Sequence, residues 1–239
     1  MPVMEKVCFV LWRHRDADVD ALDKWVTAEL VPALDAADGV RAGQVLVEAT
    51  EGASVRVGAR ADGALLAGLV ATWLDVYQDR DAIDAALATG LLHDVHAYLV
   101  TESVPHDDAS VPRPVGERAP GLTMTTIFDK KPGVDDAEFY RVWHEMHRRT
   151  TLELHPVYVY YRNEVVRALT PGAPALRGIV YEPTRTVEDM LDPHTFYGAL
   201  GDDTALKANI DRVVSETTAF IDFTTIEVAP MHSYELPRH

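Results

Sequence analysis

The sequence predicts an α+β fold in which one order of elements, β-α-β-β-α-β, occurs twice along the chain. Three observations support this prediction. A proline-rich stretch at residues 104–121 divides the 239 residues nearly in half. Each half has a helix-like segment with a tryptophan inside it, and Trp143 follows Trp25 by 118 positions (143 minus 25). The other apolar runs follow in the same order in both halves.

The first half is expected to supply its six elements from short apolar runs and one long amphipathic segment. They are expected at residues 6–12, 19–34, around 40, 68–70, 80–90 and 96–104. The last strand is expected to end at Pro105, because proline has no N–H for a strand ladder.

The second half repeats this order. Its elements are expected at residues 122–128, 135–154, around 158, 178–180, 205–218 and 220–229, with Pro230 as the end of the last strand. The order is that of a ferredoxin-like unit. We therefore divide the chain into an N-terminal repeat at 1–107, a linker at 108–120 and a C-terminal repeat at 121–239.

The two predicted sheets need a cover on their open faces. Val7, Phe9 and Leu11 alternate along the first strand, and Val157 and Val159 mark the second half. Packing the two sheets against each other would bury these side chains, form an α/β barrel and leave a pocket between the halves. Two independent domains joined by a tether are the alternative.

Composition narrows the class of protein. Lys plus Arg is 22 and Asp plus Glu is 38, so the net charge is −16, which disfavours nucleic acid and anionic membranes as partners. The single cysteine, Cys8, suggests a reducing cytoplasm, and no apolar run suggests a signal peptide or a membrane span. Nucleotide-binding glycine motifs and a G-x-S-x-G elbow are absent from the sequence.

The helix at 135–154 carries the best catalytic candidate. At 100° per residue, its sheet-facing arc contains Phe139, Val142, Trp143, Met146 and Thr150. His147 falls at the margin of this arc beside Tyr140, where an imidazole can reach a pocket as a general acid or base. In the first half the same register holds Glu29 (147 minus 118), so we expect the first half to be degenerate.

The second half resembles the EthD family of the dimeric α/β-barrel superfamily. The resemblance lies in the motifs Lys131-Pro132-Gly133, Glu138-Phe139, Trp143, His147, His155-Pro156, Tyr160, Asn163 and Gly178-Ile179-Val180-Tyr181-Glu182, and it covers most of residues 122–230. It implies the barrel fold and a small-molecule pocket. Relatives in the superfamily include polyketide cyclases, lactone isomerases, cofactor-free monooxygenases and haem enzymes, so it implies the reaction only loosely.

The candidate site combines one base with aromatic and polar side chains. We expect His147 to move a proton and Tyr160 to orient a substrate oxygen. Strand alternation places Tyr158 and Tyr160 on one face and Asn163 on the other. The expected substrate contacts are Trp143, Tyr140, Tyr158, Asn163, Glu182 and Glu29. Each of these side chains also has an ordinary structural explanation.

These observations predict a cytoplasmic, cofactor-independent enzyme that acts on a small aromatic, polyketide-like or lactone substrate, by cyclisation, dehydration, isomerisation or oxygenation. One alternative is a haem enzyme, with an axial ligand among His147, His155 and His194 and propionate partners among Arg148, Arg162 and Arg177. The other is a non-catalytic ligand-binding barrel. We expect no metal site, because His144 and His147 point 60° apart on the helix. The sequence does not decide whether the chain forms a homodimer through its helices.

Overall fold

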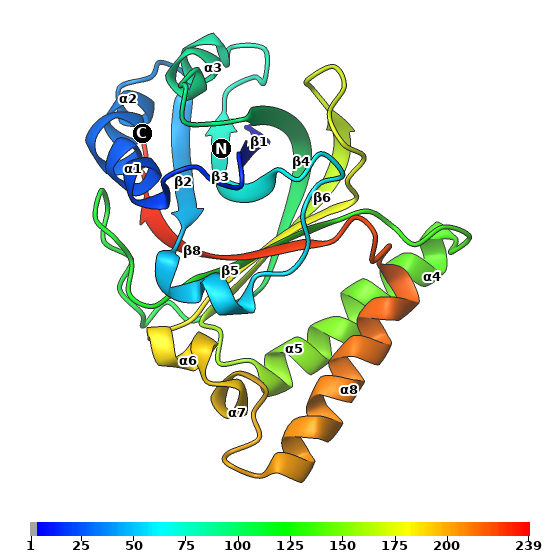
Figure 1. Ribbon diagram of the computed structural model, residues 1–239. Coiled ribbons are helices and arrows are strands. Elements are labelled where there is room, and N and C mark those ends of the chain that lie inside the picture. Colours follow the sequence, from blue (N-terminus) through cyan, green and yellow to red (C-terminus); the bar gives the residue numbers. More distant parts are fainter. Residues whose placement is uncertain (1–3) are drawn as a thin grey trace.

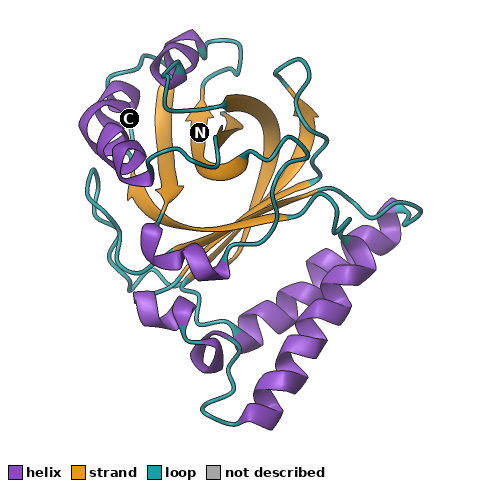
Figure 2. Cartoon of the chain, in the orientation of Figure 1, coloured by secondary structure: helices purple, strands orange, loops and turns teal. Residues whose placement is uncertain are grey.

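Eight strands, each antiparallel to both of its neighbours, form one closed barrel in this computed structural model, which describes residues 4–239 (Figures 1 and 2). The strands are β1 (Glu5–Arg13), β2 (Val40–Glu48), β3 (Leu65–Leu74), β4 (Asp94–Asp107), β5 (Thr123–Phe128), β6 (Val159–Ala168), β7 (Gly178–Pro183) and β8 (Glu227–Glu235). Around the barrel their order is β1-β3-β2-β8-β5-β7-β6-β4. The predicted α+β barrel is therefore confirmed.

The two halves of the chain contribute four adjacent strands each. The first half runs β4-β1-β3-β2 around the barrel and the second half runs β8-β5-β7-β6. The halves meet edge to edge, through the pairs β2–β8 and β4–β6. The sheets therefore do not stack as two layers with a pocket between them.

Side chains fill the interior of the barrel. One buried cluster draws a residue from every strand, namely Cys8, Leu46, Leu69, Tyr98, Ile127, Tyr161, Tyr181 and Met231. Val7, Phe9 and Leu11 point the other way and pack under helices. The expected pocket between the halves is thus wrong, because the odd-numbered side chains of β1 cover the outside of the barrel and the even-numbered ones occupy its interior.

Most helices of the first half cover the outer face of β1–β4. Those that do so are α1 (Val19–Trp25), the π-helix η1 (Val26–Leu30), α2 (Val31–Asp35) and α3 (Asp81–Leu87). The short 3-10 helix η2 (Thr50–Val55) packs against β8 instead. Asp18 caps α1 by accepting hydrogen bonds from two backbone N–H groups. Trp25, Leu34 and Ile83 are buried against Phe9 in one apolar cluster.

The helices of the second half are arranged differently. They are α4 (Asp136–Tyr140), the π-helix η3 (Arg141–His147), α5 (Arg148–Leu154), α6 (Val187–Leu191), α7 (Pro193–Phe196) and α8 (Asp203–Phe220). Figure 1 shows α5 and α8 side by side, standing away from the barrel. Phe220 is the only residue of α8 that is buried. A space therefore opens between α8 and the sheet.

The π-helical turn changes which side chains face the sheet. Met146, expected on the packed arc, is 39% exposed, whereas Thr150 is buried. A π-turn holds more residues than an α-turn, so positions after its start rotate away from the ideal wheel. Trp143 is buried as expected.

Pro105 and Pro230 lie inside β4 and β8, so the expected ends of these two strands are wrong. β4 continues past Pro105 to Asp107, and its pairing with β6 shifts register between Ser103 and His106. A register shift is how a strand accommodates a residue without an N–H. β8 begins only at Glu227 and runs through Pro230, because α8 ends at Phe220 and a turn follows, in which the Thr225 N–H donates to Asp222 O at 3.0 Å. No helix in residues 4–239 is long and apolar enough to cross a membrane.

Candidate functional site

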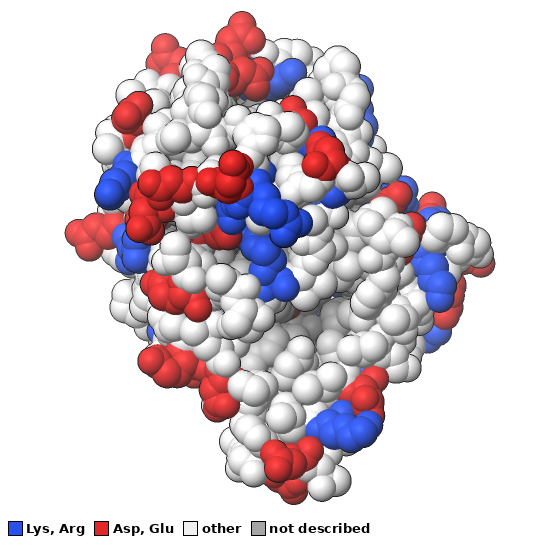
Figure 3. Space-filling view, viewed as in Figure 1, with Lys and Arg blue, Asp and Glu red and all other residues white. Residues whose placement is uncertain are grey.

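A cavity of about 400 Å³ lies between the outer face of the second-half sheet and α8. Phe128 and Val180 of the sheet, Phe196 of α7 and Phe220 of α8 contribute to its apolar walls. In Figure 3 a recess among uncharged residues separates the barrel from the projecting helices. The volume is within the range of small-molecule sites. Val214 on α8, which is 47% exposed, also borders this space.

The first half of the chain completes one wall of this cavity. Val55 and Val57, which lie between β2 and β3, are among its lining residues. The backbone N–H of Val57 donates to Val228 O at 3.0 Å, and the N–H of Val228 donates back at 2.8 Å. This reciprocal bridge fixes the segment against β8. The cavity is therefore built by both halves, although it lies on the second-half sheet.

His147 reaches the cavity from the end of η3 and is paired with a carboxylate of α8. Its Nδ1 lies 3.4 Å from Glu216 Oε2, and both side chains are 14% exposed. Thr150 Oγ1 donates to the other Glu216 oxygen at 2.7 Å. The hydrogen bond with His147 is the largest influence on Glu216 and lowers the pKa of its carboxyl. The carboxylate thus stays ionised and can orient the imidazole.

Glu182 and Tyr160 form the polar part of the sheet wall. Both line the cavity, and both are almost fully buried, at 4% and 1% exposed. Burial raises the pKa of the Glu182 carboxyl from 4.5 to about 8, so the group is mostly protonated at neutral pH. Burial and the nearby Glu182 raise the pKa of the Tyr160 hydroxyl. The wall therefore offers uncharged O–H donors.

His155 is a wall residue and not an acid or base. It follows α5, and its ring stacks on Phe196 with centroids 4.2 Å apart. Burial lowers the pKa of the imidazole to about 3, so the ring is neutral at physiological pH. Neither ring nitrogen has a hydrogen-bond partner within the described part of the chain.

The structure brings four of the eight sequence-predicted site residues together. They are His147, Tyr160, Trp143 and Glu182, all of which line the cavity.

The other four predicted site residues lie elsewhere. Tyr158 precedes β6 and faces the barrel interior, opposite to Tyr160, because regular alternation begins only at Val159. Asn163 is buried and its Nδ2 donates to Ile179 O at 3.0 Å. Tyr140 donates to Glu164 outside the cavity, and Glu29 is exposed on η1.

The sequence analysis did not predict two parts of the site. Glu216 is 69 residues from its partner His147, and no local pattern marks it. The α6–α7 segment closes one end of the cavity but lies outside the expected repeat pattern. Its signal is present in the sequence, because Thr186 and Asp189 form a capping box and Asp192 precedes Pro193.

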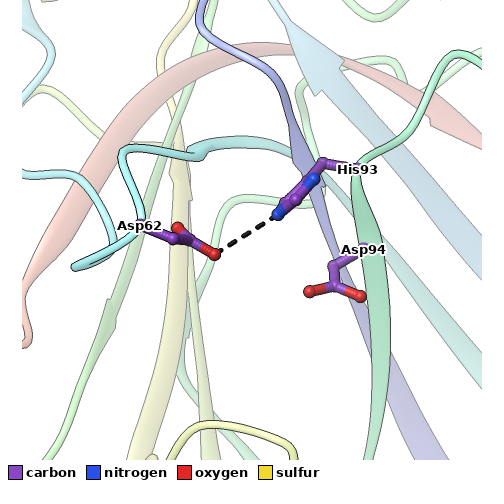
Figure 4. Close-up of side chains that lie close together, drawn as sticks. All are labelled: Asp62, His93 and Asp94. Atoms are coloured by element: carbon purple, nitrogen blue, oxygen red, sulfur yellow. Dashed lines mark hydrogen bonds and ion pairs between the residues drawn. The ribbon is translucent and has the colours of Figure 1, made fainter.

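A second group of titratable side chains lies outside this cavity, in the first half. His93 Nε2 is 3.3 Å from Asp62, and Asp94 is adjacent (Figure 4). Arg60 already pairs with both carboxylates, at 2.8 Å from Asp62 and 2.9 Å from Asp94. The carboxylates thus have a resident cation, and we assign no metal to this group.

Comparison with known proteins shows the fold. No protein-family model and no curated protein matches the chain. An anthrone oxidase-like protein is 12% identical, with 97% of this chain and 93% of that one covered and a TM-score of 0.58. A candidate monooxygenase from Fusobacterium nucleatum is 11% identical, with coverages of 100% and 96% and a TM-score of 0.54.

A chlorite dismutase from Candidatus Nitrospira defluvii is more distant in structure. It is 14% identical, with coverages of 95% and 90% and a TM-score of 0.48. The first two similarities establish that this chain has the dimeric α/β-barrel fold, with all eight strands in one polypeptide. Because identity is so low, function must be argued from the site.

Proposed function

We propose that the chain is a cofactor-independent enzyme that removes a proton next to a carbonyl group of a small aromatic, polyketide-like or lactone substrate. The observation that carries this proposal is the His147–Glu216 pair at the edge of a largely apolar cavity. A carboxylate that accepts from Nδ1 leaves the second imidazole nitrogen free to act as a base. The other imidazole of the lining, His155, is a much weaker base, and Glu182 is mostly protonated, so neither competes with His147 for the proton.

The proposed step transfers one proton from the substrate to His147 and leaves an enolate. The imidazole of His147 takes a proton from a C–H bond, and the electron pair of that bond moves onto the carbonyl oxygen to give an enolate. The Tyr160 hydroxyl lies on the sheet wall of the same cavity and is the donor for that oxygen. Cyclisation, dehydration, isomerisation and reaction with O₂ all proceed from such an enolate.

The experiment uses anthrone, a tricyclic ketone with an acidic C–H. Its exchange of that proton for deuterium is followed by NMR in D₂O without oxygen. We expect the protein to accelerate exchange and His147→Gln to lower the catalysed rate by about 100-fold or more. His194→Gln, which changes a histidine of the same half outside the cavity lining, is the control. Equal rates for the wild type and His147→Gln would exclude the proposed base.

Two alternatives make different predictions in the same samples. Admitting oxygen identifies an oxygenase by anthraquinone formation with consumption of one O₂ and release of water. A protein that binds anthrone but never accelerates exchange would instead be a binding barrel.

Haem fits this cavity poorly. The lining contains no Arg or Lys among the described residues, so the two propionates would lack cationic partners and would lie near Glu182 and Glu216. We therefore derive no step through haem. A Soret shift on haem titration that depends on His147 would contradict this assignment.

We further propose that the two halves are tandem ferredoxin-like repeats and that the second belongs with the EthD family. The identical order of strands in the two halves supports the repeat. The proposed partner is a small hydrophobic or aromatic ligand. A homodimer is a separate proposal that sedimentation velocity would test.

A further inference from the structure

Glu182 and Tyr160 are neighbours across two strands of the cavity wall. Tyr161 of β6 pairs with Tyr181 of β7 in antiparallel register. Tyr160 and Glu182 are the residues next to this pair on the two strands, and both side chains line the cavity. Within residues 4–239, the Glu182 carboxyl makes no hydrogen bond to another protein group. A buried acid without a partner leaves its hydrogen-bonding capacity for a ligand.

We infer that Glu182 is a second donor beside Tyr160 and that the two hydroxyl groups grip one carbonyl oxygen of an uncharged substrate. The substrate class is then a neutral ketone, lactone or quinone. This inference rests on the proposed function, which it deepens by naming the group that receives the developing negative charge. Glu182 thereby becomes a catalytic residue that touches the substrate.

The charges around the cavity support a neutral substrate. No Arg or Lys of the described chain lines the cavity, so a substrate carboxylate or phosphate would find no permanently charged counter-ion there. Such an anion would also meet Glu182 and would lie near the ionised Glu216 behind His147. A neutral carbonyl, by contrast, accepts hydrogen bonds from a protonated carboxyl and a phenol without leaving a buried charge.

Binding of three related tricyclic compounds tests this inference. Fluorenone carries one carbonyl oxygen, fluorene carries none, and 9-fluorenone-2-carboxylate adds an anion. Because Trp143 lines the cavity, quenching of tryptophan fluorescence reports binding. We expect fluorenone to bind about tenfold more tightly than fluorene, the value of one or two neutral hydrogen bonds. The carboxylate is expected to bind more weakly than fluorenone.

Two substitutions at one position separate donation from packing. Glu182→Gln keeps a neutral donor and should bind fluorenone within about threefold of the wild type, whereas Glu182→Leu should bind it about tenfold more weakly. Fluorene binding should be equal in all three proteins. Above pH 8 the wild type should lose affinity for fluorenone and Glu182→Gln should not, a difference that a purely structural role would not produce.

The outcomes distinguish this inference from the proposed reaction. Equal fluorenone affinity in the wild type and Glu182→Leu, or tight binding of the carboxylate, would overturn the donor role of Glu182. Because the assay measures binding at equilibrium, it does not depend on proton removal by His147. Absence of anthrone exchange with the expected fluorenone pattern would overturn the reaction and leave the ligand class standing.

Discussion

Replacing Glu182 by glutamine is expected to change how the stability of the fold depends on pH. The folded state holds the Glu182 proton up to pH of about 8, whereas the unfolded chain releases it near 4.5. The wild type therefore loses stability as pH rises from 4.5 to 8, because the unfolded state binds fewer protons in this window. Glutamine does not titrate, so the variant lacks this loss.

The magnitude follows from the two pKa values. One pH unit between them corresponds to about 1.4 kcal/mol. The free energy of unfolding of Glu182→Gln, relative to the wild type, should therefore rise by about 4 kcal/mol between pH 5 and pH 9. The constant effect of replacing a carboxyl by an amide cancels in this comparison.

Urea unfolding of both proteins at pH 5, 7 and 9 measures this difference. Glu188→Gln, at an exposed position of α6, controls for removal of one carboxylate. A gap between Glu182→Gln and the wild type that stays constant within about 1 kcal/mol from pH 5 to 9 would refute the reasoning. It would mean that the Glu182 carboxyl is ionised in the folded protein and cannot serve as a donor.

Three further predictions concern other parts of the fold. Burial lowers the pKa of His155 to about 3, so the free energy of unfolding of the wild type should fall by about 2 kcal/mol, relative to that of His155→Phe, between pH 7.5 and 5. Urea unfolding of both proteins at the two pH values would measure this difference. Cys8, whose pKa is raised to about 12 by burial, should resist a thiol-specific disulfide reagent in the folded state and react at once in urea; rapid labelling of native protein would contradict its burial. Val57→Trp should weaken fluorenone binding at least about tenfold by overfilling the wall from the first half, whereas Val76→Trp, outside the cavity lining, should not.

The fold could be predicted from local signals because its elements are regular. Apolar runs and the two tryptophans located most strands and the long helices, and the α+β barrel follows from their order. The strands were wrongly expected to end at Pro105 and Pro230, since proline removes only one backbone donor. A register shift accommodates Pro105, and Pro230 pairs with Met124 in regular register. The direction of Tyr158 could not be predicted, because it depends on where β6 starts to alternate.

The site was harder to predict because it depends on contacts between distant segments. His147 was found from its place on a helix, but its partner Glu216 comes from α8, and the π-turn that ends at His147 has no reliable sequence pattern. The space between α8 and the sheet also depends on contacts between segments that are distant in the sequence. A short helical wheel contains no information on it.

The position of α8 links the width of the cavity to the surroundings of His147. This helix forms one wall of the cavity and also carries the carboxylate that orients His147. An outward movement of α8 would both widen the opening and withdraw Glu216 from the imidazole, which would weaken His147 as a base. If His147 is the base, as proposed above, proton transfer would then be confined to the arrangement in which α8 lies against α5, as it does in this structure.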